Sequence, residues 1–244
     1  MNFSAISDKK MLGKFLRFPL NLIPDNMKMP IFQIKSLRGK KWIASTGNHG
    51  CWIGSYEYSK RLLFEKTIRQ GKIVFDIGAH VGFYTLLASA LTGTYGKVFA
   101  FEPVPENLNC LNNHLLLNKV SNVKVFDAAV SDHCGTICFD DTPGSYMGHI
   151  APQGKLRVKT VSIDELIGAG EIPVPDYLKI DVEGAEMLVL SGAKKMLADA
   201  HPIIFLATHG EEVHKQCCEF LNEMGYQLQS IGASAEEILA QYPK

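Results

Sequence analysis

Short apolar runs alternate with helix-like stretches through most of the chain. The run Ile73–Ile77 is apolar at all but one position, which is typical of a strand buried on both faces of a sheet. Residues 83–91 follow with a helical pattern, and the same alternation then repeats. The predicted strands are 73–77, 98–101, 123–130, 177–182, 203–207, 226–231 and 238–242, and the predicted helices are 83–91, 105–117, 185–198 and 212–224. Two further short strands are expected near residues 137 and 158.

Strands that alternate with helices form crossovers between parallel neighbours. We therefore predict an α/β, Rossmann-like architecture, in which a mostly parallel seven-stranded sheet lies between helices. Residues 71–244 would form this domain, and residues 1–70 would form a basic N-terminal extension that could cover an acceptor as a lid. Ligands of such sheets bind beyond the carboxyl ends of the strands, so the residues that end each strand are the candidates for chemistry.

Composition and charge narrow the class of protein. The 244 residues are 46% hydrophobic and 20% charged, which is ordinary for a globular chain. Residues 1–70 carry 13 Lys and Arg against 4 Asp and Glu, a net +9, whereas residues 71–244 carry 12 against 21, a net −9. A globally basic nucleic-acid binder is therefore disfavoured, and a basic arm that packs on an acidic body is the preferred interpretation.

The extension begins with an amphipathic pattern. Residues 9–18 interleave apolar side chains with Lys9, Lys10, Lys14 and Arg17, which predicts a basic helix that ends at Pro19. Docking on the core or on a second subunit is the preferred role. Peripheral contact of residues 9–23 with an anionic membrane is the alternative. With no secretory signal and no long apolar run, the sequence predicts a cytoplasmic protein.

The first strand ends in the segment 76–82, which reads DIGAHVG. Gly78 and Gly82 predict a tight turn that aims the N-terminus of the next helix at a ligand. The third glycine of dinucleotide-binding motifs is missing, which argues against a nicotinamide dehydrogenase. Asp76 would repel a pyrophosphate and attract an amino or sulfonium group. A simple glycine turn with a capping aspartate is the structural alternative.

The next two strand ends suggest an adenosine-like ligand. Glu102 lies 24 residues after Gly78, about where an acidic side chain meets ribose hydroxyls in nucleotide-binding folds. Pro103 keeps Glu102 extended, so its carboxylate should project from the strand end. Asp127 and Ala128 could contact an adenine ring, although a plain strand end explains them equally well.

The fourth and fifth strands carry the candidates for catalysis. Lys179, Asp181 and Glu183 share one face of a strand, where unpaired buried charge is costly. The two carboxylates could bind a cation, act as a general base or cap the next helix, and we favour a functional role; Lys179 could also extend its stem to solvent. Glu186 is interpreted as a residue of the first helical turn. His209 ends the fifth strand and is a candidate base, with a surface histidine as the alternative.

The segments FDIGAHVGFYT, FAFEPVPEN and YLKIDVEGAE, with VLSGA after them, resemble the FkbM-type methyltransferases. The resemblance extends over roughly residues 39–243. It implies a class I methyltransferase fold and an S-adenosylmethionine-dependent enzyme that methylates hydroxyl groups of sugars and natural products. The family more often has Asn where this chain has His80. An acidic residue is expected just before His209, and this chain has Ala207 and Thr208 there.

The resemblance and the strand-end residues together give a set of roles. Methyl transfer to an alcohol is an in-line displacement in which a base must take the hydroxyl proton. His209 or Asp181 is the candidate base, Glu183 would orient the acceptor, and Lys179 completes the catalytic set. The cofactor-binding set is Asp76, Gly78, Ala79, His80 and Gly82 at the methionine part, Glu102 at ribose, and Asp127 and Ala128 at adenine. No metal ligand is assigned, and a divalent cation on Asp181 and Glu183 is the less favoured option.

Three functions follow from this set. The preferred one is O-methylation of a sugar, glycolipid or natural product, with a small molecule or glycan as acceptor and no nucleic acid. The alternatives are an RNA methyltransferase that uses the basic arm, and a non-catalytic scaffold that binds the cofactor. The segment 131–160 and the N-terminal region would build the acceptor pocket. Whether the chain forms a homo-oligomer is left open.

Overall fold

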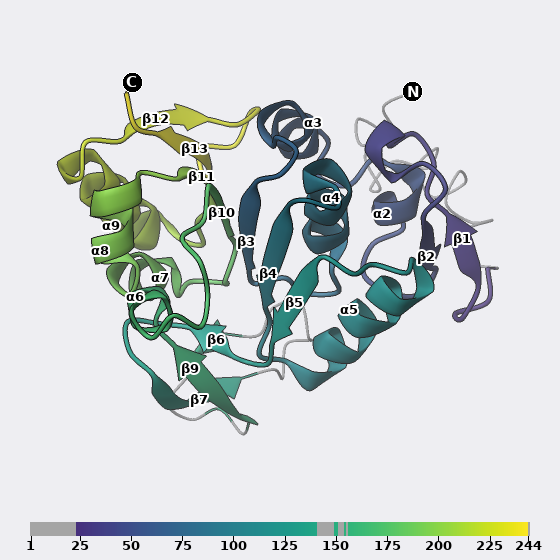
Figure 1. Cartoon of the computed structure of the whole chain (residues 1–244), viewed down its shortest axis with the longest axis horizontal. Coiled ribbons are helices and arrows are strands. Elements are labelled where there is room, and N and C mark those ends of the chain that lie inside the picture. The colour runs from purple at the N-terminus through teal and green to yellow at the C-terminus, as the bar shows by residue number, and fades with distance from the viewer. Residues whose placement is uncertain (1–22, 141–148, 151–153, 155, 244) are drawn as a thin grey trace.

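The computed structural model describes residues 23–140, 149–150, 154 and 156–243, and a seven-stranded sheet forms its centre (Figure 1). The strand order is β12-β13-β11-β10-β3-β4-β5. The bounds are β3 (Ile73–Ile77), β4 (Lys97–Phe101), β5 (Val123–Phe126), β10 (Tyr177–Ile180), β11 (Ile203–Ala207), β12 (Gln227–Ser230) and β13 (Glu237–Gln241). All pairings from β5 across to β11 are parallel, and β13 is antiparallel to both neighbours. The predicted mostly parallel sheet is confirmed.

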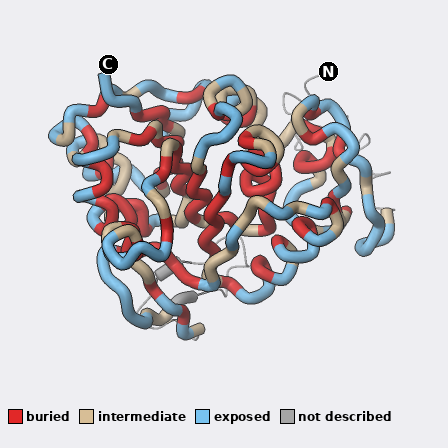
Figure 2. Tube along the Cα trace, viewed as in Figure 1, coloured by how far each residue is buried: buried red, intermediate tan, exposed pale blue. Residues whose placement is uncertain are grey.

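Helices cover both faces of this sheet because successive side chains of each strand point to opposite sides. Val74 and Phe205 pack toward one helical layer, whereas Phe75 and Leu206 pack toward the other. The first layer contains α3 (Tyr58–Thr67), α4 (Phe83–Thr92) and α5 (Pro105–Leu117); the second contains α6 (Ile163–Gly168), α7 (Glu186–Ser191), α8 (Lys194–Ala200) and α9 (Glu211–Glu223). Figure 2 shows the buried strands running through the middle of the molecule.

Two predicted elements are each split in the structure. The strand expected over 123–130 ends at Phe126, and β6 (Ala129–Val130) joins a second sheet with β7 (Gly135–Asp140), β8 (His149–Ile150) and β9 (Leu156–Val161). The helix expected over 185–198 is broken at Gly192. The Gly192 carbonyl accepts hydrogen bonds from the Ser162 hydroxyl and the Asp164 backbone N–H, so this carbonyl does not continue the hydrogen bonds of the helix. A Cβ at Gly192 would lie 2.0 Å from the Ser131 carbonyl oxygen, so a larger residue does not fit there.

Residues 23–70 pack against the sheet domain. They form β1 (Lys28–Pro30), a 3₁₀ turn η3 (Lys35–Leu37), β2 (Lys41–Ile43), α2 (Gly50–Ile53) and α3. Trp42 and Phe64 are buried in the same apolar cluster as Phe83 of α4 and Phe205 of β11. The amphipathic helix predicted over 9–18 lies outside the described residues. Within the described ranges, no helix combines the length and the apolar character needed to cross a membrane.

Candidate active site

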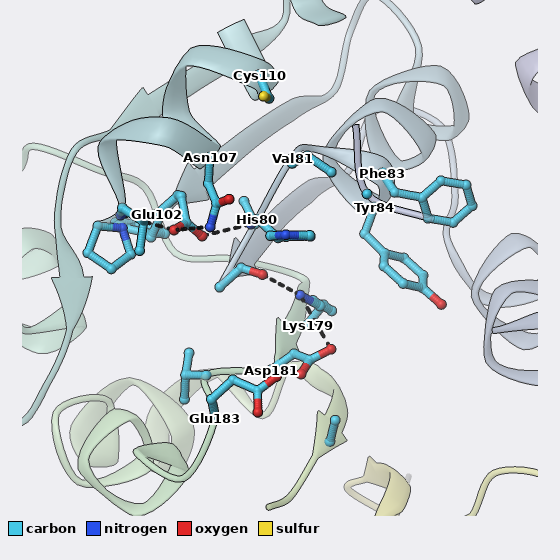
Figure 3. Close-up of a pocket in the computed structure, with 18 of the residues that line it drawn as sticks. His80, Val81, Phe83, Tyr84, Glu102, Asn107, Cys110, Lys179, Asp181 and Glu183 are labelled. Atoms are coloured by element: carbon cyan, nitrogen blue, oxygen red, sulfur yellow. Dashed lines mark hydrogen bonds and ion pairs between the residues drawn. The ribbon is translucent and has the colours of Figure 1, made fainter. Parts of the chain in front are cut away.

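A cavity of about 910 Å³ lies where the parallel strands end, as expected for an α/β sheet. Gly78 follows β3, Glu102 follows β4, Asp181 follows β10 and His209 follows β11, and all four line the cavity. Figure 3 shows Glu102 and Asn107 on one side, Asp181 and Glu183 on the other, and Lys179 between them. Four of the strand ends singled out in the sequence therefore meet around one space.

The turn after β3 is built by backbone geometry. Gly78 has φ +76°, and a Cβ there would lie 1.9 Å from the Asp181 carbonyl oxygen, so β3 and β10 approach each other in a way that requires glycine. His80 adopts φ +50°, which turns its backbone N–H toward the Glu102 carboxylate at 2.7 Å. The Lys179 ammonium donates to the Gly78 carbonyl at 2.7 Å. The turn is therefore held from both neighbouring strands.

Glu102 presents a fixed carboxylate to the cavity, although its side chain is only 4% exposed. It accepts hydrogen bonds from the backbone N–H of His80 at 2.7 Å, the backbone N–H of Val104 at 3.0 Å and the Asn107 side-chain amide at 3.1 Å. Burial raises the pKa of Glu102, and these hydrogen bonds oppose that shift. The position fits the predicted contact with ribose hydroxyls.

Asp76 lies behind the cavity wall. It is buried, and its carboxylate contacts the Lys179 ammonium at 3.2 Å and accepts a hydrogen bond from the Thr85 hydroxyl at 2.6 Å. Lys179 itself lines the cavity, so an influence of Asp76 on a ligand would pass through this lysine. Ala79 and His80, two members of the predicted cofactor-binding set, line the cavity. Gly82, Asp127 and Ala128 are not among its lining residues, which at this end include Ala129 and Val130.

His80 contributes a neutral ring to this wall. Burial, with the nearby Lys179 ammonium, lowers the pKa of His80 to about 4. The imidazole is therefore uncharged at neutral pH. It does not add positive charge near the site where a sulfonium or amino group is expected.

Asp181, Glu183 and His209 form a compact cluster at the opposite side. His209 Nε2 lies 3.5 Å from Glu183 Oε2 and 3.7 Å from Asp181 Oδ1, while its Nδ1 lies 2.8 Å from Glu186 Oε1. The hydrogen bond to Glu186, with the charges of Glu183 and Asp181, raises the pKa of His209 to about 9. Burial raises the pKa of Glu183. For Asp181 the Lys60 and Lys179 ammonium groups outweigh burial and lower the pKa.

This cluster has the chemistry for two kinds of task. Its three side chains offer ligand atoms that lie within 4.8 Å of one another, a spacing that one divalent cation could bridge. The same groups can also take and release a proton, because imidazole and carboxylate are the usual general bases. Both uses direct the reactive atoms into the cavity.

Several residues of the site carry no local signal in the sequence. Lys60 of α3 is only 3% exposed, and its ammonium lies 3.1 Å from Glu57, 3.3 Å from Asp181 and 3.0 Å from Glu237. Asp181 and Glu237 lie far from Lys60 in the chain, so only the tertiary fold brings them together. Residues 45–48 of the N-terminal region also line the cavity. The sequence pattern explains Glu186 only as a first-turn residue of a helix and gives no sign of its contact with His209.

The motif residues around this cavity match a known family. A model described as "Methyltransferase FkbM domain" matches residues 76–228. The chain belongs to the FkbM methyltransferase family. The matched region begins at Asp76 and includes every strand end around the cavity. The resemblance seen in the sequence is therefore confirmed.

Comparison with a curated relative places this FkbM-family chain beside a sugar-modifying enzyme. The hexuronic acid methyltransferase AglP of Haloferax volcanii is 32% identical over 146 residues. The match covers 59% of this chain and 59% of the relative, so the chain spans about three fifths of the length of that protein.

Solved structures show the same fold as this FkbM-family chain. An FkbM methyltransferase from Methylobacillus flagellatus KT has a TM-score of 0.53 at 18% identity, over 76% of this chain and 51% of that one. A precorrin-6y C5,15-methyltransferase from Geobacter metallireducens GS-15 has a TM-score of 0.53 at 18% identity, over 78% and 90% of the two chains. The predicted Rossmann-like methyltransferase fold is thus confirmed.

Proposed function

We propose that this protein is an S-adenosylmethionine-dependent O-methyltransferase that acts on a hydroxyl group of a sugar, glycolipid or glycosylated natural product. One observation carries the proposal: a single cavity holds a carboxylate suited to ribose on one side and an Asp–Glu–His cluster on the other. The family supports methyl transfer, and the name of the Haloferax volcanii relative supports a sugar acceptor.

The residues present fit this cofactor. The cavity of about 910 Å³ is at the large end for a ligand site, which leaves room for an acceptor beside the cofactor. Glu102 has the acceptor atoms that ribose hydroxyls need, and Asp181 and Glu183 favour a positively charged group nearby. When bound, S-adenosylmethionine would supply a methyl group on a cationic sulfur. Gly78, Ala79 and His80 would hold its methionine part.

The cluster opposite Glu102 would handle the acceptor. An alcohol is a weak nucleophile, so a group in contact with the hydroxyl has to take its proton as it reacts. His209 in its neutral form is our candidate for that base, with Asp181 as the alternative. Because the His209 pKa is raised to about 9, the neutral ring is the minor form at neutral pH, and activity that depends on it should rise with pH toward 9. Glu183 would orient the acceptor by accepting hydrogen bonds from a neighbouring hydroxyl. Lys179 would keep Asp181 ionised and the turn at Gly78 in place.

Calorimetric titration with S-adenosylmethionine and, separately, with NAD tests the cofactor assignment. The wild type should bind S-adenosylmethionine and show no comparable affinity for NAD. Glu102→Gln removes the charge that strengthens hydrogen bonds to ribose, so its affinity should fall by about 10- to 100-fold. Glu223→Gln, an exposed glutamate of α9, is the matched control and should bind like the wild type.

Absence of S-adenosylmethionine binding, or a preference for NAD, would contradict the proposal. If the cofactor binds, release of S-adenosylhomocysteine can be followed with neutral glycosides, amino sugars and hexuronic acids as acceptors. Binding without transfer to any hydroxyl compound would favour the alternative of a non-catalytic scaffold. A salt-dependent complex with RNA would favour the other alternative, an RNA methyltransferase.

Several finer assignments remain proposals. Residues 45–48 line the cavity, which supports a role of the N-terminal region in covering the acceptor. A divalent cation stays the less favoured option for the Asp–Glu–His cluster. The cytoplasmic location, membrane contact through residues 9–23 and a homo-oligomer likewise stay predictions.

A further inference from the structure

The carboxylate of Glu186 lies beneath the His209 imidazole. Its side chain is 0% exposed, although it begins helix α7 only a few residues after β10. Oε1 lies 2.8 Å from His209 Nδ1 and accepts a hydrogen bond from the Gly184 backbone N–H at 3.0 Å. A carboxylate only accepts hydrogen bonds, so Nδ1 carries the hydrogen in this contact. Glu186 therefore links the start of α7 to the end of β11.

This contact decides where the second ring nitrogen points. With Nδ1 held from behind, Nε2 faces Glu183 at 3.5 Å and Asp181 at 3.7 Å, and both residues line the cavity with His209. These distances are too long for good hydrogen bonds, so Nε2 can still engage a third group. The His209 side chain is 35% exposed, so a ligand in the cavity can reach Nε2.

We propose that Glu186 is a positioning residue: by holding Nδ1 of His209 it presents Nε2 to the acceptor hydroxyl. This inference rests on the proposed function. As the oxygen–methyl bond forms, the carbon–sulfur bond breaks with its electron pair left on sulfur, and the hydroxyl proton passes to Nε2. Glu186 does not touch the acceptor. It fixes the ring tautomer beforehand and stabilises the imidazolium that the proton creates.

Charged groups from the loop after β10 and from the start of α7 face this ring. Glu186 lies at Nδ1, Glu183 and Asp181 lie near Nε2, and together they explain why the pKa of His209 is raised to about 9. Glu186 makes the largest contribution among them. Removing its charge should therefore alter both the pKa and the tautomer of His209. Removing the charge of Glu183 should alter the pKa alone.

Nuclear magnetic resonance of histidine labelled with ¹⁵N tests this directly, with the His209 signals assigned by their loss in His209→Gln. In the wild type, the neutral ring should carry its hydrogen on Nδ1. Glu186→Gln keeps an acceptor atom for the Gly184 N–H and should fold. In this variant the His209 pKa should fall by at least about one unit, and the neutral ring should become a mixture of tautomers. Glu183→Gln is the matched control and should keep the Nδ1–H tautomer.

Activity gives a second readout once a hydroxyl acceptor is found in the screen. Glu186→Gln should lower kcat by roughly 10- to 100-fold, as for loss of other groups that orient a histidine, while KM for S-adenosylmethionine changes less than about threefold. A merely structural role would instead change both constants together or lower the thermal stability.

Two results would overturn the inference. One is a wild-type neutral ring with its hydrogen on Nε2, or a Glu186→Gln variant with an unchanged titration and tautomer. The other is selective broadening of the His209 signals by micromolar Mn²⁺ together with methyl transfer that stops when EDTA is added, because Nε2 would then be a metal ligand. Failure of the proposed function is distinguishable, since it appears as absent S-adenosylmethionine binding in calorimetry.

Discussion

Asp181 lies between two buried lysines, which offset its negative charge at the cavity. Lys60 and Lys179 approach the same carboxylate oxygen at 3.3 Å and 3.8 Å. Each lysine has further carboxylate partners, so their charges are shared among several acidic groups. Glu183, in contrast, has His209 as its cationic neighbour. Protonation of the His209 imidazole therefore alters the charge balance beside Glu183.

His209 should make the stability of the fold depend on pH. Its pKa is raised from an ordinary 6.5 to about 9 in the folded state, so it stabilises the fold fully below pH 6.5. That contribution is lost as the pH rises through about 9. Because the side chain is 35% exposed, solvent screening should limit the effect to about 1 kcal/mol. Urea unfolding of the wild type and His209→Gln at pH 6 and pH 9.5 measures it.

The stability advantage of the wild type over His209→Gln should shrink between these two pH values. Comparison with the variant cancels the ionisation of the cysteines, which affects both proteins at alkaline pH. The exposed His133, replaced by Gln, controls for loss of an imidazole. An advantage that grows with pH would show that His209 is neutral in the folded protein.

Ion pairs of Lys60 add to the apolar packing that holds helix α3 against the sheet. Lys60 connects Glu57 on its own side with Asp181 after β10 and Glu237 in β13. Tyr84 of α4 adds a hydrogen bond from its hydroxyl to Glu57 at 2.9 Å. The ion pairs thus tie an N-terminal helix to two strands that are far from it in the chain.

Lys60→Met should destabilise the protein by about 3 kcal/mol. The change leaves three partly buried carboxylates without this ammonium, and removal of one partner from a buried ion pair costs about 3–5 kcal/mol. The carboxylate side chains are 20–24% exposed, so we expect a loss of stability at the lower end of this range. Urea denaturation measures the loss. The control is Lys66→Met, at an exposed position of the same helix, which should change the free energy of unfolding by less than about 0.5 kcal/mol. Equal losses in the two variants would refute a role of the ion pairs in stability.

Elements built from local patterns could be predicted, and contacts between distant segments could not. The apolar runs of β3 and β11 and the helix that begins at Pro105 have the predicted bounds. The break at Gly192 depends on the strand segment that crosses it at Ser131, which no local pattern reveals.

The candidate site follows the same division. The strand-end rule brings Glu102, Asp181 and His209 to the cavity, although their roles stay predictions. It placed Asp76 there as well, but that side chain belongs to the strand itself and packs inside against Lys179. Lys60 joins the site through tertiary packing alone. Glu186 was missed because an acidic residue in a first helical turn needs no further explanation.

The basic N-terminal region and the acidic sheet domain are joined mainly by apolar packing where the structure describes them. Trp42 is buried in a cluster that contains side chains of α4 and β11. Its ring stacks on the His114 ring of α5, with 3.7 Å between the ring centroids. Phe64 of α3 contacts Phe205 in the centre of the sheet at 5.0 Å between ring centres. Burial of large aromatic side chains on both sides of the predicted boundary near residue 70 favours one cooperative unit.

The chain should therefore unfold in a single transition that includes residues 23–70. Its two tryptophans, Trp42 and Trp52, both lie in this region, so tryptophan fluorescence follows the N-terminal part, whereas far-ultraviolet circular dichroism follows mainly the helices of the sheet domain. Urea unfolding curves recorded with the two probes should coincide in midpoint and slope. Phe64→Ala should lower the free energy of unfolding by about 3–5 kcal/mol, and both probes should report the same loss. A fluorescence transition at lower urea than the dichroism transition would show instead that the N-terminal region detaches first, as an independent lid would.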